Sequence, residues 1–261
     1  MPSKKTSVVN TKPILIVKTG SALKELARHR GTFEDWIAAP FIAAGFTTAV
    51  VDVCGGEALP DPVHFSGVVV TGSHALVTDR EDWSEKTAAW IPGGIAAGRP
   101  FLGICYGHQL LAHALGGTVA MCPDGPEYGT VTLRLLPAAR RDSLMAGLPG
   151  RMKAQACHTQ SVVKLPRGAV LLASSDRDPH HAFAVNAVTW GLQFHPEIDA
   201  DIMRTYIRAY AADLTAAGQD PQTIHDAVTE AETSTGLLSR FATVISRLNR
   251  NFDHCPIALE T

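Results

Sequence analysis

The chain has 261 residues, of which 46% are hydrophobic and 18% are charged, and its formal net charge is −2 at pH 7. This length is sufficient for one large domain with a hydrophobic core, and the composition excludes disordered and fibrous proteins. A nearly neutral chain without a Lys/Arg cluster is not expected to have nucleic acid or an anionic membrane surface as its main partner.

The first 12 residues contain no apolar run long enough for a signal peptide, and no later segment reaches the length of a membrane span. We expect residues 1–12 to be a flexible tail.

The cysteines are widely spaced and form no C-x-x-C pair: Cys54, Cys105, Cys122, Cys157 and Cys255. This pattern predicts a reducing, cytoplasmic location rather than a disulfide framework or a zinc site. No metal and no cofactor is predicted.

The first part of the chain alternates between strand and helix patterns. Continuous apolar runs predict strands at 13–20, 47–53, 65–73 and 100–104. Helices are predicted at 33–45 and 79–98, and Pro40 and Pro92 are expected to kink or divide them. Strands of this kind that alternate with helices indicate a parallel sheet covered on both faces.

The middle of the chain changes character. Short strand-like runs at 128–136, 151–158, 169–175, 182–187 and 189–195 are separated by brief turns. They predict antiparallel strands that extend the sheet or pack on it. From Asp199 onward the pattern is helical, with apolar stripes over 202–214 and 237–248. These stripes could cover the core, form a homodimer or bind a partner. We expect the boundary between the core domain and the C-terminal helices near Gly218.

Cys105 stands where the strand at 100–104 gives way to a helical pattern, with Gly103 and Gly107 two residues away on either side. A nucleophile that projects from a strand end needs a sharp turn, and flanking glycines remove the clashes of that turn. The N-terminus of the following helix favours a thiolate, and the Tyr106 amide could hold an oxyanion. Taken alone, such a cysteine is more often an inert buried thiol.

His195 is the histidine best placed to assist this thiol. It follows a predicted strand, Pro196 turns the chain, and Glu197 lies two residues beyond the histidine. At this spacing a carboxylate can reach back to the imidazole and fix its tautomer, as in a Cys–His–Glu relay.

Other reactive pairs in the sequence have simpler interpretations. His180 and His181 are adjacent, so on a strand they would face opposite sides and could not easily share a metal ion. The same divergence argues against a Cys157–His158 dyad. Cys54, followed by two glycines but by no helix pattern, is expected in a turn.

Several segments in the same order resemble the class I glutamine amidotransferases, most strongly the glutaminase domain of GMP synthase and its free-standing relatives. They are "VVVTGS" at 68–73, "GICYGHQ" at 103–109, "EYGTVTL" at 127–133, "HAFAVN" at 181–186 and "QFHPE" at 193–197. The resemblance runs from Ile14 to Tyr210. It implies an open, mostly parallel flavodoxin-like α/β sheet with helices on both faces, extra antiparallel strands and a C-terminal helical extension. The corresponding division is 13–217 for the amidotransferase domain and 218–261 for the extension.

The resemblance also implies residue roles. Cys105 would be the nucleophile, His195 the general base and acid, and Glu197 the residue that orients the imidazole. Backbone N–H groups of Tyr106, Gly72 and Ser73 would form the oxyanion hole. Gly103 and Gly107 would flank the nucleophile elbow. The glutamine head group would be held by Gln109 and by the segment His158, Thr159 and Gln160. Two positions depart from the family pattern: Ser73 replaces the second glycine of a pair, and Gln160 replaces an acidic residue.

The implied reaction is hydrolysis of the glutamine side-chain amide through a γ-glutamyl thioester on Cys105. The residues beyond Tyr210 are too few for a synthetase domain, and no "SGGVDS"-like segment is present. We therefore expect a separate synthetase to accept the ammonia. One alternative is a hydrolase of γ-glutamyl peptides or conjugates, and another is an inactive regulatory or binding module. The intact Cys105, His195 and Glu197 weigh against the inactive module.

Overall fold

The computed structural model describes residues 12–253, so most of the predicted N-terminal tail, and Cys255, lie outside the described residues. Strands and helices alternate in the first half: β1 (Ile14–Lys18), α1 (Lys24–Arg30), α2 (Phe33–Ala43), β2 (Thr48–Asp52), β3 (Gly67–Val70), α3 (Asp82–Ala96), β4 (Phe101–Ile104) and α4 (Tyr106–Ala114). Strands follow: β5 (Thr118–Met121), β6 (Glu127–Leu135), β7 (Arg151–His158), β8 (Gln160–Lys164), β9 (Val170–Ser174), β10 (Ala182–Asn186) and β11 (Thr189–Leu192). The chain then forms helices α5 (Ala200–Ala209), α6 (Ala211–Ala216), α7 (Pro221–Asp226), α8 (Glu232–Thr235) and α9 (Leu237–Asp253).

One large sheet organises this chain. Within the described residues its nine strands run in the order β2-β1-β3-β4-β11-β10-β9-β6-β7. The pairings from β2 to β11 are parallel, and those from β11 to β7 are antiparallel. The predicted α/β sheet with extra antiparallel strands is thus confirmed. β5 and β8, which we did not predict as strands, form a separate antiparallel pair.

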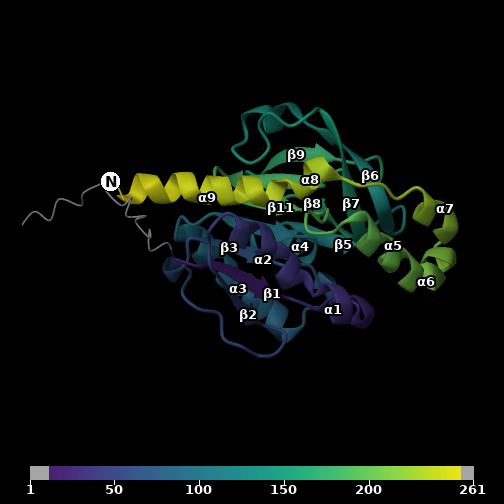
Figure 1. Ribbon diagram of the computed structural model, residues 1–261, viewed down its shortest axis with the longest axis horizontal. Coiled ribbons are helices and arrows are strands. Elements are labelled where there is room, and N and C mark those ends of the chain that lie inside the picture. Colours follow the sequence, from purple (N-terminus) through teal and green to yellow (C-terminus); the bar gives the residue numbers. More distant parts are fainter. Residues whose placement is uncertain (1–11, 254–261) are drawn as a thin grey trace, which may run out of the picture.

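Both faces of the parallel part are covered, as the uninterrupted apolar strands indicated (Figure 1). In β1, Ile14 and Ile16 point into one core with side chains of α2 and α9, whereas Leu15 and Val17 point into a second core with α3 and α4. The alternation follows from the two-residue period of a strand. The strands β1, β3 and β4 therefore contribute to both cores, and their positions are fixed from both sides.

The two prolines do not divide their helices, so the predicted division was wrong. Pro40 lies inside α2 and Pro92 inside α3, and both helices continue past them. In α2 the buried side chains Phe33, Ile37 and Phe41 recur every four residues and form one stripe on the core. Burying such a stripe offsets the roughly 3 kcal/mol that a proline costs inside a helix. Neither proline is itself fully buried.

The apolar stripe near the C-terminus covers the core of the sheet. Leu237, Phe241 and Ile245 of α9 are buried in the same core as α2. The rings of Phe41 and Phe241 lie 6.1 Å apart. Gly67 of β3 makes room for α9, because a Cβ there would come within 2.7 Å of Ile245. The boundary near Gly218 stays a prediction, but α9 beyond it packs as part of this core. None of the helices in residues 12–253 has the length and hydropathy that crossing a membrane requires.

Candidate active site

The carboxyl ends of neighbouring parallel strands bring the predicted site residues together. Gly72 and Ser73 follow β3, Cys105 follows β4, and His195 follows β11. These three strands are adjacent and parallel, so the loops that leave them meet at one edge of the sheet. This edge is where open α/β sheets bind their ligands.

Cys105 has the backbone of a strained elbow. Its φ of 49° is positive, a conformation that among the described non-glycine residues only Arg80 shares. A Cβ on Gly103 would come 2.3 Å from the Gly107 carbonyl oxygen, and one on Gly107 would come 2.4 Å from the Val70 oxygen. Both glycines are therefore required by close backbone packing. The turn projects Cys105 from the strand end as predicted.

His195 and Glu197 form a buried pair beside this cysteine. Nδ1 of His195 lies 2.7 Å from Oε1 of Glu197, and their side chains are 4% and 0% exposed. With Nδ1 engaged by the carboxylate, Nε2 is the ring nitrogen left for Cys105. The His195 backbone N–H donates to the Gln155 carbonyl at 2.8 Å, which fixes the position of the ring beyond the end of β11.

Burial alone would lower the pKa of His195. The Glu197 charge, Cys105 and hydrogen bonds to both outweigh burial and raise the pKa to about 10. The imidazole is therefore held protonated at neutral pH. A protonated histidine next to a cysteine favours the thiolate, because the opposite charges stabilise each other in a site with little water.

The turn after β3 is fixed by a buried threonine pair. Thr19 Oγ1 donates to the Thr71 carbonyl oxygen at 2.9 Å, and the Thr19 N–H donates to Thr71 Oγ1 at 3.0 Å. Gly72 lies against the site, since a Cβ there would come 3.0 Å from Cε1 of His195 and 3.7 Å from Cβ of Cys105. The Ser73 hydroxyl accepts the Ala75 N–H at 3.1 Å, so its side chain folds onto its own loop.

A cavity of about 100 Å³ opens at Cys105. Its lining includes every residue predicted to hold glutamine and most of those predicted for the oxyanion hole: Ser73, Tyr106, Gln109, His158, Thr159 and Gln160. A smaller cavity, which Cys105 also lines, has His195 and Phe33 in its wall. The predicted site residues, far apart in sequence, are therefore neighbours in space.

The predicted glutamine-holding residues are also bonded to one another. Nε2 of Gln109 donates to the backbone oxygen of Gln160 at 2.8 Å, and Nε2 of Gln160 donates to Thr78 Oγ1 at 2.6 Å. Gln109 and Gln160 are 4% and 1% exposed. Their amide nitrogens are thus directed into the protein.

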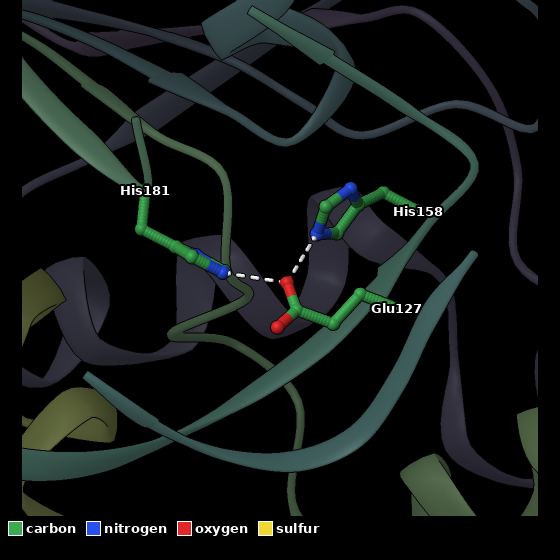
Figure 2. A group of neighbouring side chains, drawn as sticks. All are labelled: Glu127, His158 and His181. Carbon is green, nitrogen blue, oxygen red and sulfur yellow. Dashed lines mark hydrogen bonds and ion pairs between the residues drawn. The ribbon is translucent and has the colours of Figure 1, made fainter. Parts of the chain in front are cut away.

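A second buried cluster, which the sequence did not reveal as a unit, lies next to the cavity (Figure 2). Oε2 of Glu127 accepts from Nε2 of His158 at 3.0 Å and from Nε2 of His181 at 2.7 Å. Oε1 of the same carboxylate accepts from the Ser175 hydroxyl at 2.7 Å. Glu127 stands in the "EYG" segment and His181 in "HAFAVN", but nothing in their spacing indicated that β6, β7 and the turn before β10 meet.

One carboxylate and two imidazoles are a donor set that could hold a metal ion, and their ligand atoms lie within 4.8 Å of one another. Here the carboxylate oxygen lies between the two imidazoles and accepts a hydrogen bond from each (Figure 2). Burial would raise the pKa of Glu127, but these hydrogen bonds and charges lower it. For His158, burial would lower the pKa, but bonds to Cys122 and Glu127 raise it well above its usual range. The cluster is therefore a buried ion pair between Glu127 and His158, with His181 and Ser175 as two further donors to the carboxylate.

Aromatic side chains complete the walls of the site. Phe33 stacks on His195, with ring centroids 6.2 Å apart, and His74 meets Phe33 edge-on at 6.1 Å. Tyr128 and Tyr210 line the larger cavity. Sequence reasoning assigned Phe33 only to a helix, because an amphipathic stripe does not distinguish a residue that packs on the core from one that packs on the site.

The remaining reactive residues lie as the simpler interpretations predicted. Cys54 is exposed in a turn. His180 and His181 diverge: the His180 Nδ1 lies 2.5 Å from the Val162 carbonyl oxygen, whereas His181 turns toward Glu127. Cys157 lines both cavities, and burial together with the nearby Cys105 raises its pKa far above the usual range. Cys157 is thus a poor nucleophile at neutral pH.

Comparisons with known proteins agree with this geometry. Residues 18–209 match the family model for glutamine amidotransferase class-I. A GMP synthase (glutamine-hydrolysing) from Aeropyrum pernix is 37% identical over 143 residues, which are 55% of this chain and 26% of that protein. Gamma-glutamyl peptidase 4 from Arabidopsis thaliana is 31% identical over 141 residues, 53% of this chain and 56% of the peptidase.

A glutamine amidotransferase from Thermotoga maritima shares the fold. Its crystal structure superposes with a TM-score of 0.72, covering 90% of this chain and 98% of the other, at 23% identity. The match to the curated relatives is shorter: this chain spans a quarter to about half of their length.

Proposed function

Because the chain belongs to the class-I glutamine amidotransferase family, we propose that it hydrolyses the side-chain amide of glutamine through a γ-glutamyl thioester on Cys105. The observation that carries the proposal is the convergence of Cys105, His195 and Glu197 at one edge of the sheet. The cysteine has the positive φ of an elbow, and a buried carboxylate at 2.7 Å holds the imidazole. A merely structural cysteine would not need this strain.

In the proposed reaction, the Cys105 thiolate attacks the side-chain carbonyl carbon of glutamine. The His195 imidazolium then gives a proton to the nitrogen, the C–N bond breaks, and ammonia leaves. Neutral His195 next takes a proton from water, and the resulting hydroxide attacks the thioester, which releases glutamate and restores the thiolate. The raised pKa of His195 suits the first step, because the proton is already on the ring when the thiolate attacks.

The oxyanion of each tetrahedral intermediate would be held by backbone N–H groups. Tyr106 is the first residue of α4, so its N–H has no carbonyl partner within the helix and is available to an anion. The turn at Gly72 and Ser73 would supply a second donor. Gln109 and the segment His158, Thr159 and Gln160 would surround the glutamine head group, since all of them line the cavity at Cys105.

We further propose that the ammonia passes to a separate synthetase. The similar protein from Aeropyrum pernix is named a glutamine-hydrolysing GMP synthase, and the match covers 26% of its length. A cytoplasmic location is supported by the cysteines of the described residues, which are free thiols. A near-neutral net charge supports a partner other than nucleic acid. A homodimer would have to use a surface other than the buried stripe of α9.

A second candidate is hydrolysis of γ-glutamyl peptides or conjugates. It is favoured by the similarity to a γ-glutamyl peptidase over 56% of the length of that protein. The attacked carbonyl is the same in both reactions, and only the leaving amine differs. The site at Cys105 would therefore serve either substrate, and the choice depends on the space around the leaving group.

Ammonia release from glutamine by the purified chain tests the proposal. Cys105→Ala should abolish the release, whereas Cys157→Ala, a matched change in the same cavity, should retain most of it. Cleavage of γ-glutamyl dipeptides without turnover of glutamine would favour the second candidate. Equal ammonia release by Cys105→Ala and the unaltered protein would refute the assignment of the nucleophile. Absence of both turnover and a thioester on Cys105 with either substrate would favour an inactive binding module.

A further inference from the structure

A hydrogen bond that the proposed mechanism does not use reaches the sulfur of Cys105. Nε2 of Gln193 lies 3.6 Å from Sγ of Cys105, and Gln193 is fully buried. Its backbone N–H donates to the His181 carbonyl oxygen at 2.8 Å. Gln193 follows β11 and precedes His195 by two residues. In extended backbone this spacing directs both side chains to the same side, toward the cysteine.

The orientation of the Gln193 amide follows from a neighbouring backbone group. The Gln160 carbonyl oxygen can only accept, so the atom of Gln109 that meets it at 2.8 Å is Nε2. That Nε2 also lies 3.0 Å from Gln193, and because it can only donate, the Gln193 atom facing it is Oε1. Nε2 of Gln193 is thereby left to face the sulfur.

The Gln160 carbonyl group, which orients Gln109, is itself held in place. Nδ1 of His158 lies 3.0 Å from the same Gln160 carbonyl oxygen, and Nε2 of His158 bonds to Glu127. Hydrogen bonds therefore run without a break from Glu127 through His158, the Gln160 carbonyl, Gln109 and Gln193 to the Cys105 sulfur.

A second contact of the same sulfur favours the thiol rather than the thiolate. Sγ of Cys105 lies 3.8 Å from the Cys157 carbonyl oxygen, which can accept an S–H but repels a thiolate. The Gln193 N–H favours the anion. Protonated His195 already favours the thiolate, and the balance between thiol and thiolate thus depends also on whether Gln193 presents its N–H.

We infer that Gln193 is a further catalytic residue, which donates a hydrogen bond to the Cys105 thiolate, and that Gln109 is a positioning residue that sets the direction of this donor. The inference rests on the proposed role of Cys105 as nucleophile. It predicts that the ionisation of Cys105 depends on two glutamines.

The test measures thiolate formation rather than turnover. The ultraviolet absorbance of the thiolate is titrated against pH, and the same titration of Cys105→Ala is subtracted to isolate Cys105. Gln193→Met removes the donor at similar volume, and Gln193→Glu replaces it with a carboxylate. A charge-assisted hydrogen bond is worth roughly 10- to 100-fold in the thiolate equilibrium. Both variants should raise the pH midpoint, so that the thiolate fraction below it falls at least about tenfold.

Two further variants separate positioning from stability. Gln109→Met should raise the midpoint in the same direction, although the side-chain hydrogen bonds of Gln109 go to Gln160 and Gln193 rather than to the sulfur. Gln222→Met, on the exposed surface of α7, should leave it unchanged. A purely structural role of Gln193 would lower the melting temperature and leave the midpoint where it was, and that result would overturn the inference.

The hydrogen bond between Gln193 and Cys105 can also be tested in the unaltered protein, so this test does not depend on whether a variant folds. The side-chain NH2 resonance of Gln193 should shift with the same pH midpoint as the Cys105 thiolate, and an insensitive resonance would contradict the proposed bond. The proposed function has a separate criterion, ammonia release. If the unaltered protein releases none while the midpoint still depends on Gln193, the proposed function fails, whereas the hydrogen bond from Gln193 to the Cys105 thiolate is supported.

Discussion

Replacing Glu127 with glutamine should destabilise the protein in a pH-dependent way. The carboxylate accepts three hydrogen bonds, at 2.7, 2.7 and 3.0 Å, from Ser175, His181 and His158. The side chains of Glu127 and His158 are 5% and 1% exposed, so solvent cannot replace the lost partner. Removing one member of a buried ion pair costs about 3–5 kcal/mol, because the other charge is left in a nonpolar surrounding or must be neutralised.

The pH dependence follows from the two pKa shifts. The pKa of Glu127 is lowered in the fold, so its contribution is present above its ordinary value of 4.5 and is lost as the pH falls. The pKa of His158 is raised well above 6.5, so its contribution is fully present below 6.5 and is lost as the pH rises through the folded pKa. The pair should therefore contribute most between pH 4.5 and 6.5.

Urea unfolding of the unaltered protein and of Glu127→Gln, from pH 4 to about 9, measures this difference in the free energy of unfolding. His181→Gln is the matched control. It exchanges the imidazole donor for an amide and leaves the Glu127–His158 pair in place, so it should cost only about 1–3 kcal/mol. A Glu127→Gln penalty under about 1 kcal/mol, or one that does not change with pH, would show that the cluster is not an ion pair and refute the reasoning.

Three further outcomes follow from the site and the core. Glu197→Gln should lower the pKa of His195 from about 10 and reduce ammonia release at neutral pH, which a ring-proton NMR titration and the ammonia assay measure together. Gly107→Ala should prevent folding or cost more than about 3 kcal/mol, since its Cβ would lie 2.4 Å from a backbone oxygen, whereas Gly93→Ala in an open helical position should raise the melting temperature slightly. Ile245→Ala should cost about 2–5 kcal/mol by chemical denaturation, and a smaller loss would mean that α9 is not part of the core.

The sequence predicted the site best where the side-chain contacts and the backbone conformation depend on residues that are close to one another along the chain. The elbow at Cys105 is a local matter: Gly103 and Gly107 are required by contacts within two neighbouring strands and one turn. His195 and Glu197 pair across two residues, so their spacing alone predicted the 2.7 Å contact. The family resemblance then predicted that these segments, which are far apart in the sequence, belong to one site.

Features that depend on distant pairings were not predictable in the same way. β5 and β8 pair across about 40 residues, and neither has the length or alternation that distinguishes a strand locally. The prolines of α2 and α3 carry a real local signal, but the energy of burying one face of each helix outweighs it. The Glu127 cluster needs three segments whose contact only the sheet order creates.

The strand order also explains why the nucleophile and the Glu127 cluster are linked. β11 pairs with β4 on one side and with β10 on the other, so it lies between the parallel and antiparallel parts of the sheet. The residues that leave its end contact both parts. The backbone N–H of Gln193 donates to the carbonyl oxygen of His181, a member of the Glu127 cluster, and its side-chain N–H donates to Cys105. A change that displaces the His181 backbone should therefore alter the ionisation of Cys105 as well as the stability of the protein. His181→Gln should shift the Cys105 titration only if it moves that carbonyl group.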